Sequence, residues 1–140
     1  MIESITICEY VTEDLKPINK KNIFFPTDLS VQVLVKMKKM KMNTNILFNW
    51  YIEGNPDILM GSYEIPIKGK DTYPRFAVGL LDIPLLLSEK DDYNPFKKWY
   101  VLIKVEGSVK KERFEIKNNN SYNGQSEITT PYQSRYSWNA

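Results

Sequence analysis

Few side chains in this sequence could do chemistry, because histidine is absent and cysteine occurs only once, at Cys8. Histidine most often transfers protons near neutral pH and is the commonest ligand of transition metals. One thiol can build neither a cysteine-rich zinc site nor an intrachain disulfide. The composition therefore argues against most kinds of catalysis, and it predicts a protein that is not an enzyme and uses no cofactor or metal.

The best candidate for a cation site is an acidic segment in which Asp91 and Asp92 lie between Glu89 and Asn94. Their oxygen atoms are suitable ligands for Ca²⁺, but the spacing lacks the alternating register of an EF-hand loop. A solvated loop is the simpler interpretation. The sequence also lacks the GxSxG motif of hydrolases and a glycine-rich phosphate loop.

A second charged segment, residues 36–42, contains four lysines and three methionines. It could contact phosphate or an acidic partner, or it could keep the edge of a strand soluble. No aromatic residue or arginine within it could stack on bases, and the formal net charge of the chain is only +2. We therefore expect no binding to nucleic acid.

The elements that must position these side chains are predicted to be β-strands, because apolar and polar residues alternate over short runs separated by turn signals. Residues 13–17, 53–57 and 106–108 are expected turns, and residues 81–88 fit either a helical turn or an extended chain. Such spacing is typical of an all-β protein, an antiparallel β-sandwich of about seven strands. The expected strands cover residues 5–11, 21–25, 31–37, 45–52, 58–67, 75–80, 99–105 and 113–116.

Two segments resemble bacterial immunoglobulin-like domains, several families of which have no known function. They are the aromatic-rich run ILFNWY at 46–51, and the closing pair WYVLIKVEG at 99–107 with FEI at 114–116. The resemblance covers about residues 5–117 and implies an immunoglobulin-like sandwich over 1–117, followed by a polar tail over 118–140. The paired cysteines of antibody domains are missing, and a fold of this class does not by itself assign an activity.

Aromatic residues are the first candidates for contacts with a partner. Their phase in the alternation places Trp50 and Trp99 in the core. Tyr51, Tyr63 and Tyr100 are predicted to point outward, where tyrosine is common at interfaces. An exposed planar row of such rings would instead favour a carbohydrate-binding module.

The tail differs from the rest of the chain, because asparagine, serine, threonine, glutamine and tyrosine dominate it from Lys117 onward. Its composition predicts a disordered extension. Ile128, Tyr132, Tyr136 and Trp138 are spaced within it like anchors that become ordered on a partner. We expect the tail to contribute to binding.

The sequence thus favours a non-catalytic protein–protein interaction or structural module, which binds a protein partner or itself through a sheet face, an edge strand or the tail. The alternatives are a carbohydrate-binding module and a small accessory or phage-type inhibitor or structural subunit. The N-terminal residues lack the basic and apolar regions of a secretory signal. The longest apolar run, 80–87, is broken by Asp82 and Pro84 and is too short to span a membrane, so a cytoplasmic location is expected.

Overall fold

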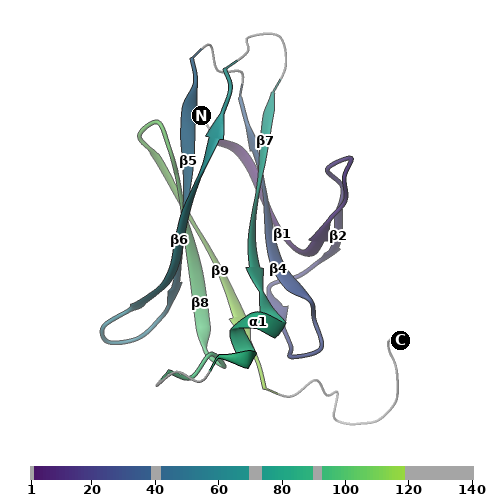
Figure 1. Cartoon of the computed structure of the whole chain (residues 1–140), viewed down its shortest axis with the longest axis vertical. Helices are drawn as coiled ribbons and strands as arrows, with labels where there is room; N and C mark the ends of the chain where they lie inside the picture. The colour runs from purple at the N-terminus through teal and green to yellow at the C-terminus, as the bar shows by residue number, and fades with distance from the viewer. Residues whose placement is uncertain (1, 39–41, 70–73, 90–92, 119–140) are drawn as a thin grey trace.

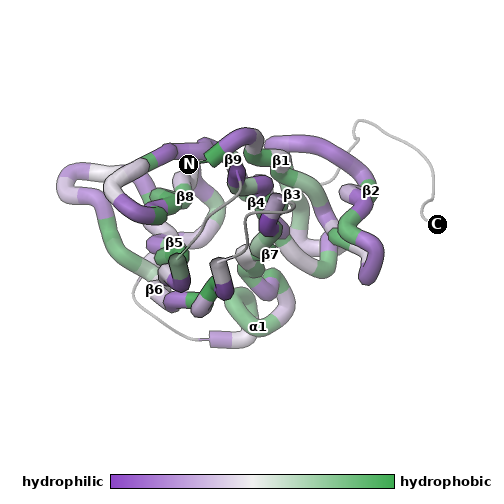
Figure 2. Tube along the Cα trace, turned by 90° about the horizontal axis from the view of Figure 1, so that it is seen from above, coloured by the Kyte–Doolittle hydropathy of each residue, from purple (hydrophilic) through white to green (hydrophobic). Residues whose placement is uncertain are grey.

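The computed structural model describes residues 2–38, 42–69, 74–89 and 93–118, which form two β-sheets packed face to face with one short helix (Figures 1 and 2). One sheet has the strand order β2-β1-β4-β7 and the other β3-β9-β8-β5-β6. This confirms the predicted β-sandwich. The elements are β1 Ile2–Val11, β2 Pro17–Lys20, β3 Ile23–Phe24, β4 Ser30–Met37, β5 Thr44–Ile52, β6 Ile58–Ile67, β7 Arg75–Asp82, α1 Ile83–Ser88, β8 Lys98–Val105 and β9 Ser108–Ile116.

The core between the sheets is built by the two-residue alternation of the strands. In β5 every second side chain is buried, and Trp50 is only 2% exposed. Trp99, on β8, is completely buried and stacks on Phe114 with ring centroids 5.9 Å apart. Both tryptophans are therefore core residues, as predicted. Burial of each such side chain contributes about 1.5–3 kcal/mol to folding.

β4 is buried on both faces, although the sequence pattern predicted one apolar face. Its odd-numbered residues 31–37 enter the core between the sheets. On the opposite face, Leu34 packs with Cys8 and Val11, and Val78 lies against this small cluster. The side chain of Gln32 accepts a hydrogen bond from the backbone of Val11, which satisfies a buried polar group. This second cluster makes part of the outer face of the four-stranded sheet apolar.

The closing hairpin is joined by two residues, Glu106 and Gly107, with φ angles of 46° and 83°. Positive φ at both positions is the geometry of a type I′ turn, which matches the twist of the adjoining strands. β9 therefore begins at Ser108, earlier than the predicted 113, because the lysines in its first half point to solvent and hide the alternation. The predicted turn at residues 106–108 is confirmed.

The first strands depart from the prediction. The turn predicted at residues 13–17 lies between β1 and β2, but Pro17 itself begins the short edge strand β2, where a proline can occupy the first position. The strand expected at residues 21–25 shrinks to the two residues of β3, which pair in parallel with β9. The chain thus passes from the four-stranded sheet to the five-stranded sheet between β2 and β3.

The ambiguous segment 81–88 divides between the end of β7 and α1. Asp82 caps the helix, since its carboxylate accepts a hydrogen bond from the backbone nitrogen of Leu85 at 3.0 Å. The helix closes one end of the sandwich and is mainly hydrophobic (Figures 1 and 2). In the described part of the chain, no helix is long and apolar enough to cross a membrane.

Candidate functional site

Tyr51 and Tyr100 form an aromatic pair on the outer face of the five-stranded sheet. They lie opposite each other on β5 and β8, and their rings stack with centroids 4.9 Å apart and planes 16° apart. Both point away from the core, as predicted. Tyr100 is nevertheless only 7% exposed, because neighbouring side chains on the same face cover it.

Tyr100 is held by two charged neighbours. Its hydroxyl donates to Oδ2 of Asp57 at 2.7 Å, and Nζ of Lys111 lies 4.1 Å from the centre of its ring. The hydrogen bond to this carboxylate raises the pKa of Tyr100 to about 12, and the same bond lowers the pKa of Asp57. Tyr100 therefore remains a neutral donor at physiological pH, and one face of its ring is occupied by a lysine.

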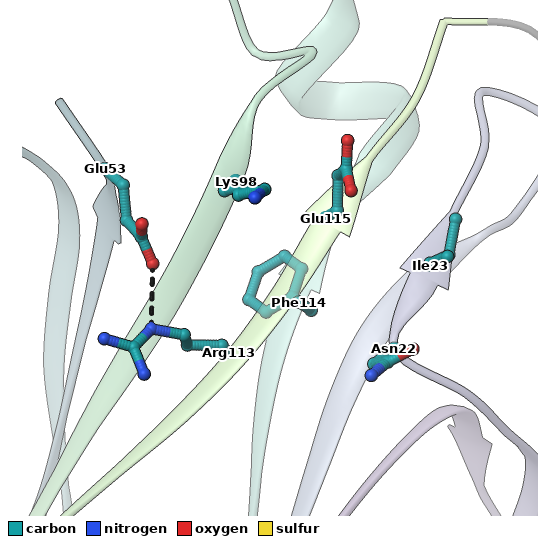
Figure 3. A pocket seen from close by; sticks show the side chains of 7 residues that line it. All are labelled: Asn22, Ile23, Glu53, Lys98, Arg113, Phe114 and Glu115. Carbon is teal, nitrogen blue, oxygen red and sulfur yellow. Dashed lines mark hydrogen bonds and ion pairs between the residues drawn. The ribbon is translucent and has the colours of Figure 1, made fainter.

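Two neighbouring shallow hollows lie on the five-stranded sheet, one beside Tyr100 and the other toward β3. One, of about 660 Å³, is bordered by Tyr100, Asp57 and Lys111 among others. The other, of about 540 Å³, includes Glu53 and Arg113, whose side chains form an ion pair at 3.1 Å (Figure 3). The seven residues that line the second hollow are Asn22, Ile23, Glu53, Lys98, Arg113, Phe114 and Glu115 (Figure 3).

These hollows contain charges of both signs, and some of them already pair with one another. Glu53 is bound to Arg113, while Lys98 and Glu115 carry opposite charges at opposed positions of the backbone ladder. The carboxylate of Asp57 accepts from Tyr100 and from the backbone of Gly54. The groups held by these bonds are not available to a small ligand.

Tyr63 does not belong to this outer face, which corrects the prediction that it points outward. The register of β5 and β6 places it opposite Phe48, and side chains opposite each other lie on the same face of a sheet. Their ring centroids are 5.5 Å apart, and burial raises the pKa of Tyr63. The tyrosine turns inward because its hydroxyl finds a partner there, the backbone N–H of Leu80 on the opposite sheet.

The four outer edges of the two sheets differ in how they are protected against further pairing. β2 starts with a proline and pairs only with residues 8–11 of β1, whose remaining edge contains a register shift between Ile2 and Ser4. β3 pairs only with residues 115–116 of β9, and the remaining edge of β9 carries the charged residues 110–113. β6 contains Pro66 and a register shift near Tyr51. Short strands, prolines, bulges and charged side chains are the usual means by which proteins protect an edge.

β7 lacks these means of protection. It has eight residues, its ladder with β4 runs without a register shift, and its charged residues are only the terminal Arg75 and Asp82. Leu80 donates its N–H to Tyr63, so the backbone of Leu80 faces away from β4. Because the backbone groups of a strand alternate in direction, those of Phe76 and Val78 face the open edge as well.

An apolar row follows the same edge on the outer face. Phe76, Val78 and Leu80 lie opposite Lys36, Leu34 and Gln32 of β4, on the side away from the core. Phe76 is 36% and Leu80 45% exposed, and Val78 adjoins the cluster around Leu34. We call these three side chains, with the open backbone edge beside them, the β7 strip.

Sequence reasoning recognised β7 as a strand but missed the β7 strip. Its signal was the run FAVGLL between Arg75 and Asp82, which carries apolar residues on both faces. A run of this kind fits a central strand equally well. Its place at an edge follows only from the order of the strands in the sheet.

Several predicted features lie outside the described residues. They include the tail anchors Ile128, Tyr132, Tyr136 and Trp138, the acidic pair Asp91 and Asp92, and the middle of the lysine-rich segment, residues 39–41. Within the described ranges, no three acidic, cysteine or histidine side chains come together in a way that could hold a metal ion.

Comparison with known proteins adds no assignment to this description. No protein-family model matches the chain, and no curated protein sequence matches it significantly. The function must therefore be argued from the surfaces described above.

Proposed function

We propose that this protein is a non-catalytic interaction module that binds another protein chain through the β7 strip. The observation that carries the proposal is the contrast between three protected sheet edges and one open edge flanked by apolar side chains. An edge of this kind binds an extended segment by adding it to the sheet as a further strand.

The β7 strip offers two sources of binding free energy. The backbone groups of Phe76 and Val78 can form ladder hydrogen bonds, each worth about 0.5–1.5 kcal/mol net. The exposed parts of Phe76 and Leu80 add apolar area, at about 25 cal/mol per Å² buried. Backbone pairing selects an extended chain, and the apolar row selects partners with apolar residues at alternate positions.

We also propose that the sandwich is immunoglobulin-like. The order β1-β4-β7 in one sheet and β9-β8-β5-β6 in the other corresponds to strands A-B-E and G-F-C-C′ of that fold. The assignment is based on topology, and it gives no information about the partner.

A carbohydrate-binding module is less well supported. Such a module needs aromatic rings whose faces are open to a sugar. Tyr51 and Tyr100 stack on each other, and Lys111 covers Tyr100. No observation on the described residues favours sugar binding over protein binding.

The proposal can be tested by photo-crosslinking. A benzoylphenylalanine residue placed at position 80 of the full chain should form covalent adducts with protein in an extract of the producing cells. The same residue at position 109, which is also exposed and lies on β9 of the other sheet, should form none. Adding Val78→Lys should abolish the adducts at position 80.

Two results would contradict the proposal. One is the absence of protein adducts at position 80, both in the extract and with the purified chain alone. The other is equal labelling at positions 80 and 109, because nonspecific contact would then explain the adducts. Circular dichroism of each variant checks that the β-sandwich is retained.

A further inference from the structure

We infer that the partner of the β7 strip is a second copy of this chain, paired antiparallel about a twofold axis so that the two four-stranded sheets become one continuous sheet. This inference rests on the proposed function, because it names the occupant of the same edge. It follows from the symmetry, charge and backbone chemistry of β7.

A twofold interface requires a surface that matches itself. When the axis is perpendicular to the sheet, both sandwiches lie on the same side, and outward side chains of one β7 meet outward side chains of the other. The row of Phe76, Val78 and Leu80 contains no charge, so no like charges meet along it. The apolar row is therefore compatible with its own copy.

The charged ends of β7 favour an antiparallel arrangement. The strand begins with Arg75 and ends with Asp82. Antiparallel pairing brings the positive end of each strand toward the negative end of its partner. A parallel pairing would instead bring like charges together, which is unfavourable.

The backbone donors of β7 indicate one register. The N–H groups of Phe76 and Val78 face the open edge, whereas that of Leu80 is already bound to Tyr63. Centring the axis on Ala77 pairs Phe76 of each copy with Val78 of the other, and all four of these N–H groups then find a carbonyl. The bond between Leu80 and Tyr63 stays intact.

The same register explains where the new ladder would end. The next pair along the strands would join Leu80 to Pro74 of the other copy. Proline has no backbone N–H, and the N–H of Leu80 is committed to Tyr63, so neither residue can donate. Ala77 meets its own copy at the centre, where its side chain points into the core and carries no charge.

Sedimentation velocity on the full chain over a wide range of concentration tests the dimer. The wild-type chain should show a reversible monomer–dimer equilibrium. Val78→Lys should weaken it roughly tenfold or more, because lysine protects an edge and introduces like charges into the row. Val109→Lys, at an exposed valine on the other sheet, should dimerise like the wild type.

Cysteine pairing tests the register. Phe76→Cys and Val78→Cys are purified separately, and Cys8 is left in place because it is fully buried. Residues that exchange ladder hydrogen bonds have Cα atoms about 5.5 Å apart, within reach of a disulfide. Mild oxidation should therefore cross-link a mixture of the two variants far more than either variant alone.

The outcomes separate this inference from the proposed function. A chain that stays monomeric, but still forms adducts with a different protein at position 80, overturns the second copy and leaves the proposed function standing. A chain that stays monomeric and forms no adducts overturns both. Efficient cross-linking of Val78→Cys alone overturns the register centred on Ala77.

Discussion

The outer faces of the two sheets both carry large side chains. They differ in whether those side chains, and the backbone beside them, already have partners within the chain. On the five-stranded sheet, Tyr100 has a ring neighbour, a carboxylate and a lysine. On the four-stranded sheet, the β7 strip ends in an open backbone edge beside exposed Phe76 and Leu80. Tyrosine alone is therefore a poor guide to an interaction surface, because contacts within the chain can already satisfy it.

The largest expected effect concerns the core that supports both faces. Trp50→Ala should lower the free energy of unfolding by about 3–5 kcal/mol, because it removes a buried ring and leaves a cavity. Val109→Ala, at an exposed site, should change it by no more than about 0.5 kcal/mol. Urea unfolding measures both. Equal, small losses would place Trp50 outside the core.

A smaller effect is expected where β7 packs on the opposite sheet. A Cβ atom at Gly79 would lie 2.7 Å from the ring of Phe48, so Gly79→Ala should cost about 1–3 kcal/mol through overpacking.

Gly61→Ala is the matched control, because its nearest neighbour, a ring carbon of Trp50, lies 4.0 Å away. Thermal or urea unfolding compares the two variants. If Gly61→Ala were the more damaging change, the close approach of β7 to Phe48 would not limit the packing.

The third prediction concerns the hydroxyl that joins β6 to the open edge. Tyr63→Phe removes the acceptor for the N–H of Leu80 and should cost about 0.5–1.5 kcal/mol of stability. It also frees a donor on the edge, so self-association should become no weaker and a longer ladder becomes possible. Sedimentation velocity measures this. Loss of the dimer in this variant would mean that Tyr63 helps to form the interface.

The sequence predicted the interior of the sandwich better than its surface. Trp50 and Trp99 were placed correctly because alternation follows directly from burial. Tyr63 was misplaced because weight was given to the frequency of tyrosine at interfaces, although Tyr63 shares its phase on β6 with Ile65 and Ile67. The β7 strip was missed for another reason, since strand order is set by pairing between distant segments.

The β2 segment shows a related limit. Pro17 is a strong turn signal, yet an edge strand can begin with proline because its N–H is not required by a neighbour. Turns are nevertheless found where the sequence predicted them, before Pro17, after Ile52 and at Glu106 and Gly107, because their turn residues act locally. Local signals thus predicted turns and buried faces, and nonlocal pairing decided which edge stayed open.

The smallest effect concerns Tyr100, on the outer face of the five-stranded sheet, and would appear in a pH titration. The pKa of Tyr100 is raised to about 12 in the folded chain, mainly by its hydrogen bond to Asp57. The bond therefore contributes its full stability below the pKa of an unfolded tyrosine, about 10, and this contribution is lost as pH rises through 12. The lowered pKa of Asp57 gives a second loss as pH falls below its unfolded value, about 3.9.

Absorbance of tyrosinate at high pH should thus reveal one group that titrates late. Asp57→Asn should return this titration toward the ordinary range, and Val78→Lys should leave it unchanged, because Val78 and Tyr100 lie on the outer faces of different sheets. If Val78→Lys shifted the titration of Tyr100, the outer faces of the two sheets would be coupled. The contrast between the bonded groups around Tyr100 and the open edge of β7 would then fail.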